Sequence, residues 1–127
     1  MNIAIVNCQR IIPVPISKIR FAARKALRKL QREYDQELSI VFVGPQRMRR
    51  MNKKYLGHDY VTDVITFDYG EIIVCPGQAA RNAKRYGNTV EGELVLYVIH
   101  GILHLAGYED KTPDGLRRMR AKERELM

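Results

Sequence analysis

The pattern of apolar and polar positions in the first half of the chain predicts two strands and two helices in alternation. Residues 2–7 and 38–43 are short apolar runs of β-prone side chains, and each predicts a strand. Residues 17–32 place their apolar side chains three and four positions apart, which predicts an amphipathic helix between the strands. A shorter helix is predicted after the second strand, with its end at Gly57.

The second half predicts a hairpin and three further helices. Residues 64–67 and 71–75 are two strands joined by a three-residue connection that contains Gly70, so they are expected to pair antiparallel. Helices are predicted over residues 77–86, 89–106 and from 112 onward. Asn88 with Glu91 resembles a capping box at the start of the second of these helices. That helix is apolar almost all round, so we expect it to be central and buried.

Together these elements predict an α+β fold with a small mixed sheet of about four strands, one hairpin forming its antiparallel edge. The 127 residues, 46% of them hydrophobic, are enough for one core, so we expect a single domain over residues 1–127. No apolar run reaches the ~20 residues of a membrane span, and Cys8 and Cys75 form no Cys-x-x-Cys pair. A cytoplasmic protein without membrane association is therefore expected.

The charge distribution points to a polyanionic partner. There are 22 basic and 14 acidic side chains, a net charge of +8, and the first 32 residues contain no acid. RNA is the expected partner, the alternative being a surface that is basic only for solubility. The candidate RNA-binding residues lie on the first two predicted helices: Arg24, Arg28, Arg47, Arg50, Lys53 and Lys54. Tyr55, Tyr60 and Tyr69 are candidates to stack on unpaired bases, although packing in or beside the core is the simpler expectation.

Two histidines on the buried helix suggest a metal site. His100 and His104 are four residues apart, so their rings lie on one face of the helix, close enough to share an ion. Gly107 ends the helix, and the next turn brings Glu109 and Asp110 back towards the same end. Two imidazoles and one carboxylate with an open position are typical of catalytic zinc. The alternative is that each ring is satisfied by a backbone or carboxylate partner.

The pattern differs from that of zinc proteases, in which glutamate follows the first histidine as the general base. Here that residue is Gly101, which accepts no proton. The candidate bases are Glu109 and Asp63, and the sequence does not choose between them. Asp63 is also a candidate to orient a metal-bound histidine, or alternatively to cap a turn.

Three blocks of the sequence resemble the YbeY family of bacterial rRNA maturation factors. Residues 100–110, H-G-I-L-H-L-A-G-Y-E-D, look like the family signature H-G-x-L-H-L-x-G-Y-D-H. Residues 52–67 are similar to the family pattern N-x-x-Y-R-x-x-D-x-x-T-D-V-L-S-F, and residues 70–76 resemble a third block. The blocks occur in the family's order over residues 38–110, which makes chance similarity improbable.

The resemblance implies a metal-dependent endoribonuclease, specific for single strands, that acts in ribosomal RNA maturation and ribosome biogenesis. It implies ribosomal RNA and the small ribosomal subunit or its assembly factors as partners, and one zinc ion per chain at His100, His104 and Asp110. It also places the loop of His58 near the metal, where this ring is a candidate alternative ligand or proton carrier. The other interpretation of His58 is an exposed loop histidine.

Two departures from the family pattern keep an alternative function open. Asp110 stands at the family's third histidine ligand, and an oxygen donor favours other divalent ions more than imidazole does. Leu56 stands where the family has an arginine associated with RNA cleavage. The alternative is a non-catalytic rRNA-binding or ribosome-binding assembly factor with a degenerate or structural metal site. A hydrolase of peptides or small molecules is a third hypothesis, against which Gly101 and the basic surface argue.

Overall fold

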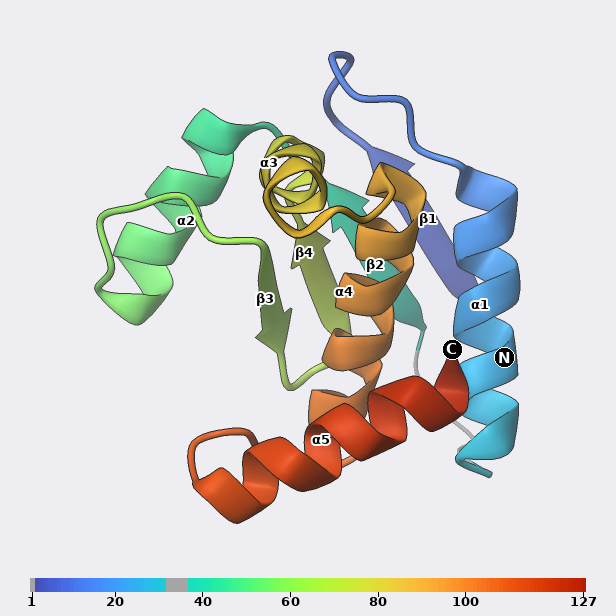
Figure 1. The fold of residues 1–127 in the computed structure, drawn as a ribbon. Helices are drawn as coiled ribbons and strands as arrows, with labels where there is room; N and C mark the ends of the chain where they lie inside the picture. Colours follow the sequence, from blue (N-terminus) through green and yellow to red (C-terminus); the bar gives the residue numbers. More distant parts are fainter. Residues whose placement is uncertain (1, 32–36) are drawn as a thin grey trace.

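The computed structural model describes residues 2–31 and 37–127. Its elements follow the predicted order (Figure 1): β1 (Ile3–Asn7), α1 (Ile16–Lys29), β2 (Leu38–Phe42), α2 (Pro45–Leu56), β3 (Val64–Phe67), β4 (Glu71–Val74), α3 (Pro76–Tyr86), α4 (Val90–Leu105) and α5 (Pro113–Leu126). The strands form one sheet in the order β1-β2-β4-β3. Strand β2 is parallel to both β1 and β4, whereas β3 and β4 are antiparallel. The predicted α+β fold, with a mixed four-stranded sheet and an antiparallel hairpin at its edge, is confirmed.

The sheet separates a larger core from a smaller one. Alternate side chains such as Ile40, Phe42 and Ile72 belong to the larger core, which also contains buried residues of α1, α3, α4 and α5. Residues of the opposite face, including Ile73, pack with Met48 of α2 in the smaller core. Helix α4 lies in the middle of the thicker layer and contacts α1, α3, α5, β3 and β4 (Figure 1). This is the central, buried helix that its apolar composition predicts.

Two predicted boundaries differ from the structure. Helix α1 ends at Lys29, and residue 32, its predicted end, lies outside the described residues. The capping box is wrong, because Thr89 rather than Asn88 caps α4: the Gly92 N–H donates to Thr89 Oγ1 at 3.0 Å. The Asn88 side chain instead donates to Glu93 Oε1 at 2.7 Å, so it satisfies a buried carboxylate within the protein.

None of the three tyrosines lies in the core, since Tyr55, Tyr60 and Tyr69 are 53%, 55% and 60% exposed. Helix α2 covers the sheet through residues nearer its start, such as the fully buried Met48. The rings of Tyr55 and Tyr69 contact Phe67 at the end of the edge strand β3, with centroid distances of 5.2 and 5.6 Å. Aromatic surface therefore remains available at this edge of the sheet.

None of the described helices is long and apolar enough to cross a lipid bilayer. Both cysteines are free; Cys75 is buried and Cys8 is exposed.

Candidate metal centre

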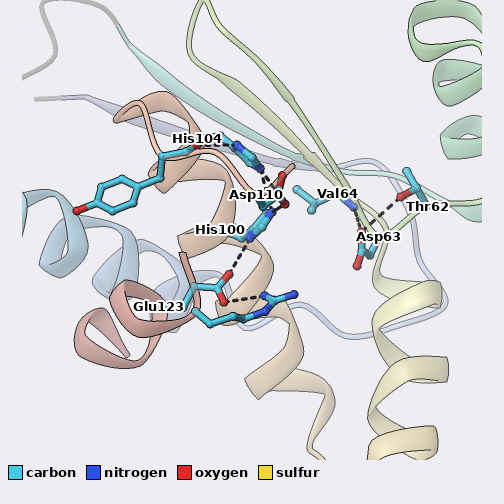
Figure 2. Close-up of polar contacts among 9 residues, drawn as sticks. Thr62, Asp63, Val64, His100, His104, Asp110 and Glu123 are labelled. Atoms are coloured by element: carbon cyan, nitrogen blue, oxygen red, sulfur yellow. Dashed lines mark hydrogen bonds and ion pairs between the residues drawn. The ribbon is translucent and has the colours of Figure 1, made fainter. Parts of the chain in front are cut away.

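Three of the predicted site residues converge at the end of α4. His100 and His104 project from successive turns of the helix, and Asp110 reaches them from the turn that follows (Figure 2). The two Nε2 atoms lie 3.0 Å apart, and Asp110 Oδ2 lies 3.3 Å from His100 Nε2 and 3.6 Å from His104 Nε2. Ligands bound ~2.0–2.1 Å from a tetrahedral zinc ion are separated by ~3.3 Å. The three separations bracket that value, so this group could hold a metal ion.

The end of α4 brings Asp110 to the two rings. Ala106 is the last residue with helical geometry, and Gly107 has a φ of +97°, a left-handed conformation that an L side chain rarely adopts. The Tyr108 N–H then donates to the Leu103 carbonyl at 2.9 Å, which closes the end of the helix. The chain therefore reverses direction within a few residues of His104, and this reversal sets the third ligand beside the first two.

Both histidines are held from behind by partners at Nδ1. His100 Nδ1 lies 2.7 Å from Glu123 Oε2, and His104 Nδ1 lies 3.0 Å from the Tyr108 carbonyl oxygen. Because these oxygens are acceptors, each Nδ1 carries the donated hydrogen, and each Nε2 is left with a lone pair facing the other ligands. Such outer partners fix the tautomer and the orientation of metal-bound histidines.

Glu123 is a functional candidate that sequence reasoning missed. It lies on α5, is 3% exposed, and also accepts a hydrogen bond from Arg120 Nη1 at 2.7 Å. Burial by itself raises the pKa of this carboxyl, but the hydrogen bonds from His100 and Arg120 outweigh burial and leave the pKa below its ordinary value. The available signal was an acidic residue on the otherwise apolar face of the last predicted helix, at helical spacing from Met119 and Leu126.

The variant Glu123→Gln should lose stability in a pH-dependent way. A lowered folded-state pKa means that the carboxylate stabilises the fold above its unfolded pKa, ~4.3, and that this contribution is lost as pH falls through the lower folded value. We expect the metal-free variant to be ~1–3 kcal/mol less stable than the metal-free wild type at pH 7. Urea unfolding measured between pH 7 and pH 3 checks this. A stability difference that grows towards low pH would contradict it.

The structure does not bring all the predicted catalytic residues to the rings. Asp63 Oδ1 accepts the Val64 N–H at 2.8 Å, and neither histidine has Asp63 as its Nδ1 partner (Figure 2). The hydrogen bond of Asp63 is therefore that of a residue that caps a turn. Glu109 is exposed next to Asp110, and His58 lies in an exposed loop with its ring 5.5 Å from that of Tyr60. Catalytic roles for Glu109, Asp63 and His58 stay predictions.

Comparison with known proteins decides the family. The family described as Endoribonuclease YbeY matches residues 5–127 of the chain. An endoribonuclease YbeY of Chlorobium phaeovibrioides is 40% identical over 119 residues, which cover 87% of this chain and 78% of the relative. Another, of Thermodesulfovibrio yellowstonii, is 32% identical over 152 aligned positions that cover 100% of this chain and 96% of the relative. The chain belongs to the YbeY family.

The fold agrees with a solved structure. The solution structure of TM1509 from Thermotoga maritima superimposes with a TM-score of 0.65 at 32% sequence identity, covering 98% of this chain and 88% of that one. YbeY proteins are metal-dependent endoribonucleases of a family involved in rRNA maturation, so the predicted family and class of enzyme are confirmed. Membership also implies association with ribosomal RNA or the ribosome.

Within this YbeY fold the three candidate metal ligands, His100, His104 and Asp110, lie where two cavities meet; we call these three residues the metal group. One cavity, of about 540 Å³, lies between β3 and the end of α4, and its lining includes Leu56, Thr66 and Glu109. We call it the β3 cleft. The position at which the YbeY pattern has arginine therefore faces the cleft, but Leu56 places no positive charge there. Both His100 and Asp110 also line the second cavity, of about 650 Å³.

The candidate RNA-binding residues divide between two surfaces of this YbeY chain. Four of them are exposed on α2, the helix that ends at the β3 cleft: Arg47, Arg50, Lys53 and Lys54. Arg24 and Arg28 line a separate cavity on α1, next to the exposed ring of Phe21. Helix α1 packs against β1, at the opposite edge of the sheet from β3 (Figure 1). RNA binding by either surface stays a prediction.

Proposed function

We propose that this chain is a zinc-dependent endoribonuclease that cleaves single-stranded segments of ribosomal RNA in the cytoplasm. One ion per chain is held by His100, His104 and Asp110. The observation that carries the proposal is the convergence of three ligand atoms, each within 4.8 Å of the others, while both histidines are already bonded at Nδ1. The whole chain, residues 1–127, acts as one domain in this proposal.

The donor set supports zinc with an open coordination position. Two imidazole nitrogens and one carboxylate oxygen are the three protein ligands common in catalytic zinc sites. A divalent ion held there supplies positive charge that polarises a phosphodiester oxygen and lowers the pKa of water. Because Asp110 is an oxygen donor where the family signature has histidine, a preference for another divalent ion such as Mn²⁺ is the alternative outcome.

The protein groups around the ligands have separate roles in this proposal. Glu123 and the Tyr108 carbonyl hold the two rings in the tautomer that keeps both Nε2 atoms available. Asp63 and Glu109 line the β3 cleft together with His100, which supports either carboxylate as the group that accepts a proton from the attacking group. His58 lines neither of the cavities that meet at the ligands, which makes it the weakest of the three candidate bases.

The basic face of α2 holds the RNA backbone next to the cleft. Arg49 and Lys53 have Asp59 as an ion-pair partner at 2.8 and 4.0 Å. Arg47 and Arg50 have no ion-pair partner among the described residues, so their guanidinium groups are available for phosphate. Contacts of this kind make binding sensitive to salt and little dependent on sequence. The basic face of α1 would contact a more distant part of the same RNA.

Metal removal tests the proposal. We expect the purified protein to contain about one zinc ion per chain and to cut a labelled single-stranded rRNA fragment, but not the same fragment annealed to its complement. Dialysis against a chelator should abolish cleavage, and zinc should restore it, with Mn²⁺ and Mg²⁺ compared in parallel. Metal content by mass spectrometry and cleavage products on a sequencing gel are the measurements.

Two outcomes would overturn this function. Undiminished cleavage by protein shown to be metal-free would contradict metal dependence. Tight RNA binding without cleavage at any metal would favour a non-catalytic rRNA-binding factor, the function that Leu56 in place of arginine favours.

A further inference from the structure

The cavity of about 650 Å³ beside the metal group has no role in the proposed cleavage reaction. Its lining comes mainly from α3, α4 and α5, and it adjoins the β3 cleft at His100 and Asp110. We call it the α3–α5 pocket. The two cavities share four lining residues, so they adjoin at two of the candidate ligands, His100 and Asp110, whereas His104 lines only the β3 cleft; the four are Asp63, Val64, His100 and Asp110. A polymer bound across the ligands would therefore occupy both sides.

The floor of the α3–α5 pocket is a connected set of polar side chains. Asn82 Nδ2 donates to the Tyr97 hydroxyl oxygen at 2.6 Å, and Asn88 Nδ2 donates to Glu93 Oε1 at 2.7 Å. Tyr97 and Glu93 are each only 5% exposed, and all four residues line the pocket. These amides are held in place by partners inside the protein, and Asn82 Oδ1 also accepts a hydrogen bond from Gln78 Nε2 at 3.0 Å. The second N–H of each amide and the Asn88 side-chain oxygen are groups of the kind that read the edge of an unpaired base.

The wall on α5 carries two arginines one turn apart. Arg120 donates to Glu123 and is thereby tied to the metal group. Arg124 lines the same pocket, and among the described residues it has no hydrogen-bond or ion-pair partner. A planar guanidinium that is free of protein carboxylates suits two-point contact with a phosphate. Both cavities are lined by carboxylates, but among the described residues only the α3–α5 pocket is lined by arginines, whereas Lys111 is the cation that lines the β3 cleft.

An exposed aromatic ring stands at the edge of the pocket. Tyr86 is the last residue of α3, is 63% exposed and lines the pocket. The Arg85 guanidinium lies 5.5 Å from the centre of its ring. Exposed rings beside cationic side chains are the usual platform on which proteins stack single-stranded bases.

We infer that the α3–α5 pocket binds the ribonucleotide unit next to the scissile phosphate. Arg124 contacts its phosphate, Tyr86 stacks on its base, and Asn82 and Asn88 bond the edge of that base. The inference rests on the proposed function, because it places the neighbouring phosphodiester at the metal group. The family pattern has an arginine at position 56 of α2, where this chain has Leu56. In this inference Arg124 of α5 provides a phosphate contact that Leu56 does not provide.

Three variants test this subsite. Cleavage of a labelled single-stranded oligoribonucleotide is measured for wild type, Arg124→Ala and Tyr86→Ala, with zinc content determined for each. The matched control is Arg118→Ala, which removes the same charge from α5 but faces a different cavity. We expect KM to rise about tenfold for Arg124→Ala and about fivefold for Tyr86→Ala, with kcat and zinc content unchanged, and the control to stay within twofold of wild type in KM.

Binding is measured separately with a fluorescent single-stranded oligodeoxyribonucleotide, which provides phosphates and bases but is not cut by an endoribonuclease. Arg124→Ala should lower the salt dependence of log K by about one unit, the loss of one phosphate contact. Wild type that cleaves RNA while both pocket variants match the control would overturn the subsite and leave the proposed function standing. Wild type that fails to cleave, while both variants still lose affinity for the probe, would overturn the function and support the subsite.

Discussion

The variant His104→Ala is expected to lose its metal ion and its RNA cleavage together. One of three convergent ligand atoms is removed, and the remaining pair does not complete a zinc site. We expect zinc content to fall from about one ion per chain to nearly none and cleavage to slow by at least ~10²–10³-fold, the loss found when a main electrostatic stabiliser of a transition state is removed. Mass spectrometry of the purified variant and a single-turnover cleavage assay measure the two effects.

His104 is a cleaner target than His100. The partner behind His104 is a backbone carbonyl, whereas removing His100 leaves the buried Glu123 carboxylate without one of its two donors. Compared in their metal-free forms, His100→Ala should be less stable than wild type, whereas His104→Ala should unfold much as wild type does; both variants should lose metal. His58→Ala is the matched control, since it removes the remaining histidine and should retain zinc. Loss of zinc from His58→Ala with retention by His104→Ala would show that the ligand set is wrong.

The candidate ligands could be predicted from sequence because short-range geometry determines them. A spacing of four residues on a helix puts two rings on one face whatever the rest of the fold does. Asp110 follows three residues after Gly107, the residue that reverses the chain, so few other positions were open to it. The order of helices and strands was predictable for a similar reason, since periodicity is a local property.

Glu123 could not be predicted in this way because its partner is 23 residues distant. Helical spacing places residue 123 on the buried face of α5, but the contact with His100 depends on how α5 crosses α4.

The same limit applies to the start of α4. Asn88 and Thr89 are both good helix caps, and the choice follows from the buried Glu93, which engages the Asn88 side chain.

The split of the basic residues also depends on tertiary structure. The sequence predicts a single RNA-binding set from the cations of α1 and α2, since both helices have a charged face. The sheet order puts β1 and β3 at opposite edges, and the two helices lie with them. Strand order arises from long-range pairing, which a local pattern of hydrophobic residues does not contain.

The variant Gly101→Glu is expected to leave the protein largely unfolded. A Cβ atom at position 101 would lie 2.8, 2.9 and 3.0 Å from three side-chain atoms of Ile72, because α4 packs very closely on β4 at this point. A glutamate would add the burial of an unpaired charge, which costs at least several kcal/mol, to an overlap that costs ~1–3 kcal/mol or more. The sum is comparable to the ~5–15 kcal/mol stability of an ordinary domain. Soluble yield and urea unfolding are the measurements.

Alanine at the same position separates overlap from charge. Gly101→Ala gains ~1 kcal/mol of helix propensity and loses ~1–3 kcal/mol to overpacking, so a net loss of up to ~2 kcal/mol is expected. Combining it with Ile72→Val should recover part of that loss, which a double-mutant cycle measures. Gly101→Glu with wild-type stability would contradict the close approach. This close approach leaves no room beside His100 for the glutamate that zinc proteases use, so the likeness to those enzymes ends at the two histidines.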